Sequence, residues 1–233
     1  MGTVYLIPTI LAEGATQCLP AYVLDAVKAC SVFFVEDERT ARRYLKSIWR
    51  EMVIDDQEWF TMKKVTDETA AAFRQRLKDG KNIAVISEAG CPGVADPGQK
   101  LAALAQEMNA TVRPLVGPNS ILLALMASGL NGQQFQFVGY IPISAQERIA
   151  TIKALEAESK TKRCTQIFIE TPYRNNQLLE TLTKTCHAHT RICVAVDLTA
   201  ASESVTTKTA QGWKAAMPEL HKRPAIFLML AEG

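Results

Sequence analysis

Three segments of the chain place glycine, proline and charged residues directly after an apolar run, where a loop could do chemistry. The longest is Ser87–Gly98, which carries three glycines and two prolines between an apolar strand pattern and a helical one. Glycines let a backbone approach a ligand closely, and prolines fix the path of the loop. The segment therefore indicates either a loop that binds a ligand through its backbone or a structural turn in which Asp96 caps the next helix.

The two other segments combine carboxylates with arginine. Glu36 and Asp37 follow an apolar run and precede Arg39, and Glu170 follows a later run and precedes Arg174. Carboxylates at the carboxyl edge of a sheet could accept protons, and arginines there could contact phosphate or carboxylate groups. The alternatives are a helix start in which the acidic residues complement the helix dipole, and a cap with a surface salt bridge. Arg42 and Arg43 belong to either a solvated face or a phosphate-binding one.

Other chemistries find little support in the sequence. The chain has neither GxxxxGK[ST] nor GxGxxG after its first strand, which disfavours kinases, GTPases and ordinary dehydrogenases. The six cysteines form no CxxC pair and the three histidines complete no ligand set, so we expect no metal site and no disulfide framework. Cys91 has no sequence neighbour that would lower its pKa, so a nucleophilic role is disfavoured.

The elements that must position these loops alternate between short apolar runs and stretches of helical period, which is typical of α/β folding. We expect strands at 3–7, 32–35, 82–87, 111–116, 136–140, 165–170, 192–196, 204–208 and 225–230. We expect helices at 21–29, 38–49, 99–108, 121–128, 146–160 and 175–186, and one more that Thr66 or Asp67 caps and that stops at Gly80. Strands follow one another directly in the second half, which predicts a mixed sheet there.

Composition and turn-forming residues indicate the number of domains, the boundary between them and the location of the protein. The 233 residues, 48% of them hydrophobic, allow one large or two small domains, and the turn formers at Gly117-Pro118 indicate a boundary, giving domains 1–116 and 117–233. No apolar run reaches the roughly 20 residues that span a bilayer, so we expect a cytoplasmic protein without a membrane partner. The net charge of +2 decides nothing about nucleic acid.

Taken in order, these loops resemble the tetrapyrrole (corrin/porphyrin) methylase superfamily, and within it the small-subunit ribosomal RNA cytidine 2'-O-methyltransferase branch. The resemblance extends over nearly the whole chain, and the Ser87–Gly98 loop is its most specific part. The segments that carry it are Gly2–Leu6, Glu36–Thr40, Ser87–Gly98, Gly117-Pro118, Ala127–Leu130, Glu170–Arg174 and Glu232-Gly233.

The resemblance implies two α/β domains, a mostly parallel sheet in the first and a mixed one in the second, with S-adenosylmethionine in a cleft between them, and a homodimer. It implies a cofactor site made largely of backbone, formed by Pro8, Ser87, Gly90, Gly93, Val94, Asp96, Pro118 and Ser120. Glu36, Asp37 and Glu170 are then the candidate catalytic carboxylates, and Arg39 and Arg174 the candidate substrate contacts.

The resemblance predicts methyl transfer from S-adenosylmethionine to ribosomal RNA. The chain departs from the branch at Thr9–Ala15, at Asn119, at Asp197–Ala200 and at Arg223–Ala225. The changed Thr9–Ala15 loop favours an alternative methyl acceptor, either a small molecule such as a tetrapyrrole or a protein side chain. A protein that binds S-adenosylmethionine without transferring its methyl group is the remaining alternative.

Overall fold

The computed structural model describes residues 1–231, so the Glu232-Gly233 motif lies outside the described residues. The chain forms two compact units, Met1–Asn119 and a second that begins at Ser120. We call them the N-terminal and C-terminal units and describe each by itself. None of the helices in the described part of the chain is both long and apolar enough to cross a membrane.

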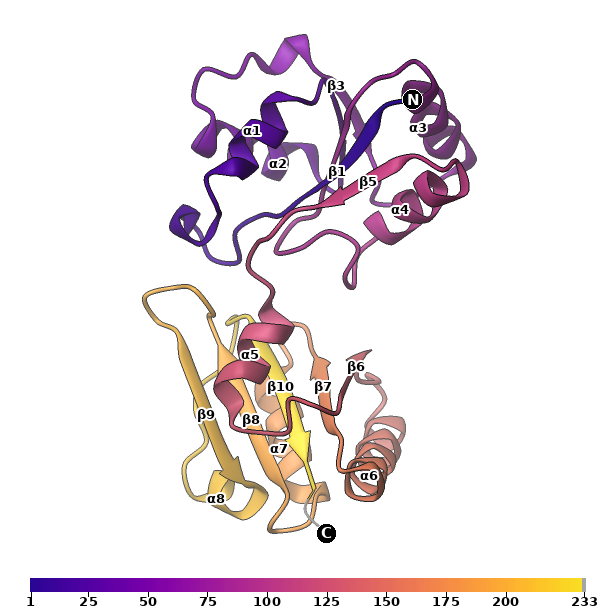
Figure 1. The fold of residues 1–233 in the computed structure, drawn as a ribbon. Helices are drawn as coiled ribbons and strands as arrows, with labels where there is room; N and C mark the ends of the chain where they lie inside the picture. The colour runs from indigo at the N-terminus through magenta and orange to yellow at the C-terminus, as the bar shows by residue number, and fades with distance from the viewer. Residues whose placement is uncertain (232–233) are drawn as a thin grey trace. The chain divides into compact units, whose positions relative to one another are not determined.

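The N-terminal unit is a parallel sheet between two layers of helices (Figure 1). The strand order is β3-β2-β4-β1-β5, and every pair is parallel. The strands are β1 (Thr3–Ile7), β2 (Val32–Val35), β3 (Glu58–Thr61), β4 (Ile83–Ile86) and β5 (Thr111–Pro114). The helices are α1 (Tyr22–Lys28), α2 (Glu38–Ile48), α3 (Asp67–Lys78) and α4 (Gly98–Glu107), with short 3₁₀ turns at Thr16–Cys18 and Ile54–Asp56.

Alternating side chains of each buried strand supply the two cores of this unit. In β2, Phe33 packs with residues of α1 and α2, whereas Phe34 packs with residues of α3 and α4. Both faces of the sheet are therefore covered, as a parallel sheet requires. Because all five strands run the same way, the loops after β1, β2 and β4 emerge at one edge, where ligands bind in open α/β sheets.

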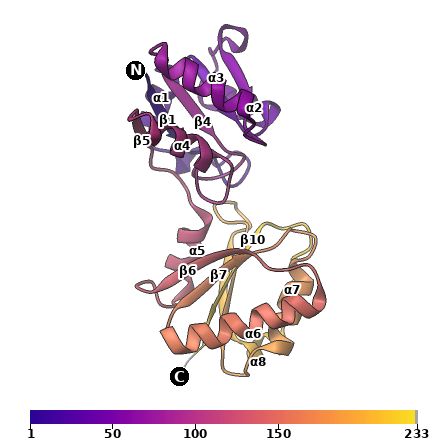
Figure 2. The same ribbon diagram turned by 90° about the vertical axis from the view of Figure 1, so that its right-hand side faces the viewer.

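The C-terminal unit is a mixed sheet of order β6-β7-β10-β8-β9, in which only the β6–β7 pair is parallel. Its strands are β6 (Phe135–Tyr140), β7 (Thr165–Ile169), β8 (Arg191–Val196), β9 (Ser204–Thr209) and β10 (Ala225–Leu230). Its helices are α5 (Ser120–Ser128), α6 (Ala145–Lys162), α7 (Asn175–Thr185) and α8 (Ala210–Ala215). Figure 2 shows α6 and α7 on one face of this sheet and α5 on the other.

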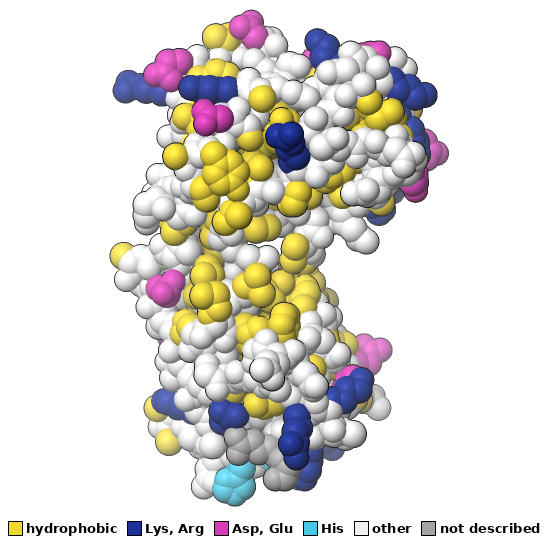
Figure 3. Space-filling view, viewed as in Figure 1, with side chains coloured by type: hydrophobic (Ala, Val, Ile, Leu, Met, Phe, Trp, Pro, Cys, Tyr) yellow, Lys and Arg dark blue, Asp and Glu magenta, His cyan; other side chains and the backbone are white. Residues whose placement is uncertain are grey.

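Helix α5 carries hydrophobic side chains on opposite sides of its axis. One side packs on the sheet, and the other side exposes hydrophobic side chains. Ala124 is fully buried, whereas Leu122 and Met126 are exposed over 48% and 79% of their surface. The exposed side chains contribute to the hydrophobic surface over α5 in Figure 3. Lysine and arginine lie elsewhere on this unit in that view.

The parallel and mixed sheets confirm the fold class expected from the sequence, and each expected helix and strand is present within a few residues of its expected bounds. The sequence interpretation missed β3 and α8. The turn formers at Gly117-Pro118 indicate a domain boundary after residue 116, whereas the two compact units divide after Asn119.

Candidate functional site

The Ser87–Gly98 loop is folded around the carboxylate of Asp96. The Asp96 oxygens accept hydrogen bonds from the backbone N–H of Gly93 at 2.9 and 3.0 Å and from that of Gly98 at 2.6 Å. Gly90, Gly93 and Ala95 have positive φ angles, so the backbone reverses direction repeatedly within the loop. Burial raises the pKa of the Asp96 carboxyl, and the hydrogen bonds from the loop partly oppose this.

The capping role considered for Asp96 is therefore modified by the structure. Pro97 occupies the N-cap position of α4, and Asp96 binds the N–H of Gly98, the first residue of that helix. Its carboxylate is committed to the loop itself. A ligand at this loop would thus meet mainly backbone groups.

Pro8, the loop and Gly117-Pro118 lie together at the carboxyl edge of the first sheet. The N–H of Thr9 donates to the carbonyl of Gly90 at 2.8 Å. A Cβ at Gly90 would lie 3.3 Å from the Pro118 carbonyl oxygen, and one at Gly117 would lie 2.1 Å from Cβ of Pro8. The lack of a side chain at Gly117 is therefore what lets the two chain segments touch.

Cys91 belongs to the same contact region, with its thiol 3.6 and 3.5 Å from the carbonyl oxygens of Gly117 and Pro118. Burial raises the pKa of the Cys91 thiol, so the sulfur stays protonated and donates to these carbonyls. It fills the space between the loop and Gly117-Pro118. This geometry agrees with the low weight that the sequence gave to a nucleophilic cysteine.

Glu36 connects the loop after β2 to the loop after β4. Its Oε2 accepts a hydrogen bond from the backbone N–H of Glu88 at 3.1 Å. Burial raises the pKa of the half-buried Glu36 carboxyl, and the negative charges of Glu88 and Asp96 add to this rise. A carboxylate with a raised pKa is a better proton acceptor near neutral pH, which makes Glu36 the carboxylate of this edge best suited to a general base.

Asp37, in contrast, is the N-cap of α2. Its Oδ1 accepts from the backbone N–H of Thr40 at 2.8 Å and from the Thr40 hydroxyl at 2.7 Å. These hydrogen bonds hold the pKa of the Asp37 carboxyl below its ordinary value. Of the two roles that the sequence allowed for Asp37, the geometry supports the helix cap.

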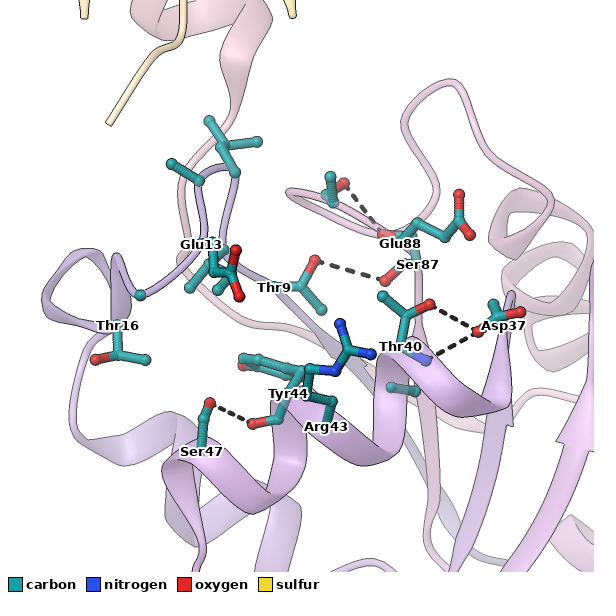
Figure 4. Close-up of a pocket in the computed structure, with 16 residues that line it drawn as sticks. Thr9, Glu13, Thr16, Asp37, Thr40, Arg43, Tyr44, Ser47, Ser87 and Glu88 are labelled. Atoms are coloured by element: carbon teal, nitrogen blue, oxygen red, sulfur yellow. Dashed lines mark hydrogen bonds between the residues drawn. The ribbon is translucent and has the colours of Figure 1, made fainter. Parts of the chain in front are cut away.

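A cavity of about 480 Å³ opens beside Asp37 and Glu88 at the same edge. The Thr9–Gly14 segment, the first turns of α2 and the start of the Ser87 loop line it (Figure 4). Tyr44 lies at its base, 7% exposed, and its hydroxyl donates to the carbonyl of Pro8 at 2.6 Å. Part of the Thr9–Ala15 loop, one of the segments that depart from the ribosomal RNA methyltransferase branch, thus forms one wall of this cavity.

Glu170 and Arg174 lie in the C-terminal unit and bind each other. Glu170 Oε1 accepts from Arg174 Nη2 and from the Thr171 N–H, both at 2.6 Å, and the Glu170 side chain is fully buried. Burial acts to raise the pKa of the Glu170 carboxyl, but the hydrogen bonds and charge of Arg174 and the Thr171 N–H outweigh it, so the pKa is lowered. Oε2 of Glu170 has no hydrogen-bond partner within residues 1–231.

The remaining candidate cofactor and substrate residues differ in their exposure and in the elements that carry them. Ser87 is buried at the end of β4 and Val94 is exposed in the loop, while Ser120 is the first residue of α5. Arg39 is exposed next to Asp37. No group of three or more histidine, cysteine or acidic side chains in the described part of the chain could hold a metal ion.

Comparison with known proteins adds a family. The family model for Tetrapyrrole (Corrin/Porphyrin) Methylases matches residues 14–212. The chain is 32% identical to Ribosomal RNA small subunit methyltransferase I of Micromonospora olivasterospora, over 74% of this chain and 52% of that protein. It is 28% identical to the protein of the same name from Escherichia coli O157:H7, over 88% of this chain and 68% of that protein. The chain thus spans about half to two thirds of the length of these relatives.

Solved structures show the same fold at low sequence identity. The methyltransferase CobJ superposes with a TM-score of 0.65 at 17% identity, covering 99% of this chain and 95% of CobJ. Uroporphyrin-III C-methyl transferase from Thermus thermophilus, complexed with S-adenyl homocysteine, superposes with a TM-score of 0.58 at 15% identity, covering 98% of this chain and 97% of that one.

Proposed function

Because the chain belongs to the tetrapyrrole (corrin/porphyrin) methylase family, we propose that it is an S-adenosylmethionine-dependent methyltransferase whose methyl acceptor is RNA of the small ribosomal subunit. The names of the curated relatives support the RNA acceptor. The observation that carries the proposal is the Asp96-centred loop at the carboxyl edge of the first sheet, inside the region that the family model matches.

The residues of this edge fit the cofactor. Gly93 has a positive φ and open space where a Cβ would lie, so a ligand can approach its backbone. We propose that Pro8, Ser87, Gly90, Gly93, Val94, Asp96, Pro118 and Ser120 hold the cofactor, with Asp96 acting by fixing the shape of the loop. When bound, S-adenosylmethionine supplies an electrophilic methyl group on a positively charged sulfur.

The chain must also orient the methyl acceptor and remove its proton. A ribose hydroxyl loses a proton as it is methylated, and Glu36 is the base that the geometry favours, because its pKa is raised and its carboxylate is held toward the Glu88 N–H. Asp37 contributes by beginning α2 at this edge. Glu170 remains a proposed catalytic carboxylate, and Arg39 and Arg174 remain proposed substrate contacts, the first on the exposed start of α2 and the second as the ion-pair partner of Glu170.

Two measurements test this function. Calorimetry should detect binding of S-adenosylhomocysteine by the purified chain, and label from methyl-labelled S-adenosylmethionine should enter small ribosomal subunits from cells that lack the protein. Label only in small-molecule or protein fractions would replace the RNA acceptor, and cofactor binding without label in any fraction would favour a binding protein. No cofactor binding at all would refute the proposal.

We also propose a homodimer, which the family resemblance implies, and a cytoplasmic location. Light scattering of the purified chain measures the first, and cell fractionation measures the second. A monomer at micromolar concentration would refute the dimer without affecting the proposed activity.

A further inference from the structure

Helix α2 carries three arginines near its start, and the structure gives them different environments. Arg42 binds Glu38 at 2.8 Å and lies over the ring of Trp59 at 5.0 Å. Arg39 is exposed outside the cavity lining. Arg43 alone of the three lines the cavity of about 480 Å³.

Arg43 has no counter-charge of its own. It forms no ion pair and no side-chain hydrogen bond with any residue from 1 to 231. Figure 4 shows its guanidinium group extending into the space between Thr9 and Thr40. Arg43 is an exposed residue at the wall of the cavity. A guanidinium in such a place without a carboxylate partner is suited to bind an anionic group of a ligand, and its planar donors match a phosphate.

The backbone around Arg43 is fixed, so the pocket is largely preformed. The neighbouring residue Tyr44 ties α2 to the loop after β1 through its bond to the Pro8 carbonyl. On the opposite wall Thr9 is 3% exposed, and its hydroxyl lies 3.5 Å from the carbonyl oxygen of Ser87. Such a site does not need to reorganise before it takes a ligand.

The other charges of the pocket restrict the ligand. Asp37, Glu13 and Glu88 also line it; the Asp37 carboxylate is bonded to Thr40, and the side chains of the other two form no ion pair within the described residues. A tetrapyrrole with several carboxylates would place negative charge against these two groups with a single cation to balance it. A nucleotide has one phosphate for Arg43, and its amino and hydroxyl groups can donate to carboxylates.

We infer that this pocket binds one unpaired nucleotide of the RNA, with Arg43 holding its phosphate. The inference rests on the proposed function, because it takes RNA as the methyl acceptor. The cavity volume lies within the range of about 300–1,000 Å³ that is usual for small-molecule sites. A base that is stacked in a duplex cannot enter such a pocket, so the nucleotide must be single-stranded or flipped out.

The test is fluorescence anisotropy of the full chain with a labelled seven-nucleotide unpaired RNA, between 50 and 200 mM salt. Arg43→Ala should weaken binding about tenfold at low salt and reduce the slope of log affinity against log salt by about 0.7, the loss expected for one phosphate contact to a single strand. Arg43→Lys should keep the slope and lose part of the affinity, because lysine retains the charge without the planar donors. Arg50→Ala is the matched control, since Arg50 is exposed outside the cavity lining and its side chain forms no ion pair or hydrogen bond within the described residues.

Competition assays identify the group that is bound. Cytidine 5'-monophosphate should displace the labelled RNA from the wild-type chain at a concentration that cytidine does not match, and this difference should disappear in Arg43→Ala. Equal competition by both compounds, or equal losses for Arg43→Ala and Arg50→Ala, would overturn the inference. Displacement by uroporphyrin, but not by the nucleotide, would also overturn it in favour of a tetrapyrrole.

Failure of the inference and failure of the proposed function give different results. Binding of S-adenosylhomocysteine is measured on the same preparations, and we expect Arg43→Ala to retain it. Suppose that the chain binds the cofactor and transfers methyl groups, but that its RNA affinity does not depend on Arg43. This result would refute the nucleotide-binding pocket and leave the proposed function intact. Absence of cofactor binding in the wild-type chain would refute the proposed function, whereas the Arg43 dependence would still be read from the RNA assay.

Discussion

Substitution of Asp96 tests whether one carboxylate holds the shape of the proposed cofactor loop. In Asp96→Ala, the N–H groups of Gly93 and Gly98 lose the acceptor that they now contact at 2.6–3.0 Å. Each hydrogen bond to a charged group contributes roughly 1.5–3 kcal/mol, and relief of the buried charge returns part of that sum. For two donors on a half-buried carboxylate we expect a net loss of about 2 kcal/mol in the free energy of unfolding.

The same loss should reappear in cofactor affinity. If the loop of Asp96→Ala is disordered in the free protein, ordering it on binding costs about 2 kcal/mol, which corresponds to a roughly 30-fold weaker affinity for S-adenosylhomocysteine. Asp96→Asn keeps one oxygen in place and should lose less of both quantities. Urea unfolding and calorimetry measure the two losses.

Asp55→Ala is the matched control, because Asp55 is an exposed carboxylate with no side-chain hydrogen bond in the described residues. Suppose that Asp96→Ala unfolds at the same urea concentration as the wild-type chain and binds the cofactor within threefold of it. The loop would then keep its shape without the carboxylate, and the reasoning from its hydrogen bonds would be wrong.

Three further substitutions test other parts of the structure. Because the pKa of Glu36 is raised, methyl transfer should decline on acidification at a pH above 4.5, the ordinary value, and the pH–rate profile of Glu36→Gln should lack that limb. Arg174→Ala leaves the buried carboxylate of Glu170 without its cation and should cost about 2 kcal/mol in urea unfolding at pH 7. Since the pKa of Glu170 is lowered by this pair, the stabilisation is present above the unfolded pKa and should disappear as the pH falls through the folded one; a difference that stays constant down to pH 3 would contradict this. Gly117→Ala forces a Cβ against the facing proline ring and should cost about 1–3 kcal/mol in thermal unfolding, whereas Gly132→Ala, which meets open space, should not destabilise the chain.

The sequence predicted those helices and strands whose buried residues recur at the regular spacing of a helix or form a short apolar run. The strand β3 was missed because its four residues, Glu58–Thr61, show no apolar alternation. It pairs with β2 in parallel, and its aromatic side chains stack on those of β2, Trp59 on Phe33 and Phe60 on Phe34, at 4.9 and 4.7 Å between ring centroids. Helix α8 was missed because six residues are too few to show a helical period.

In the candidate site, the sequence located the loops but could not assign their side chains. Glu36 and Asp37 are adjacent in the chain, yet one contacts the next loop and the other caps its own helix. Arg42 and Arg43 likewise differ only by the rotation of about 100° per residue along a helix. Arg42 meets the carboxylate of Glu38 one turn earlier on the same helix, whereas its contact with Trp59 and the cavity that Arg43 lines depend on segments that are distant in sequence.

The position of β1 in its sheet has a consequence for synthesis of the chain on the ribosome. Val4 pairs with Ile83 on one side and Val112 on the other, so β1, the earliest strand of this sheet in chain order, is made before both of its partners. At about 5–20 residues per second, translation of the residues between them takes on the order of ten seconds. Both edges of this apolar strand stay unpaired until β4 has been made, and one edge stays unpaired until β5 has been made. The second sheet has the reverse order, because its last strand, β10, inserts between β7 and β8. Each sheet is therefore completed only when its final strand has left the ribosome. In the first sheet that strand is β5, which pairs with the free edge of β1; in the second it is β10, which joins β6-β7 to β8-β9.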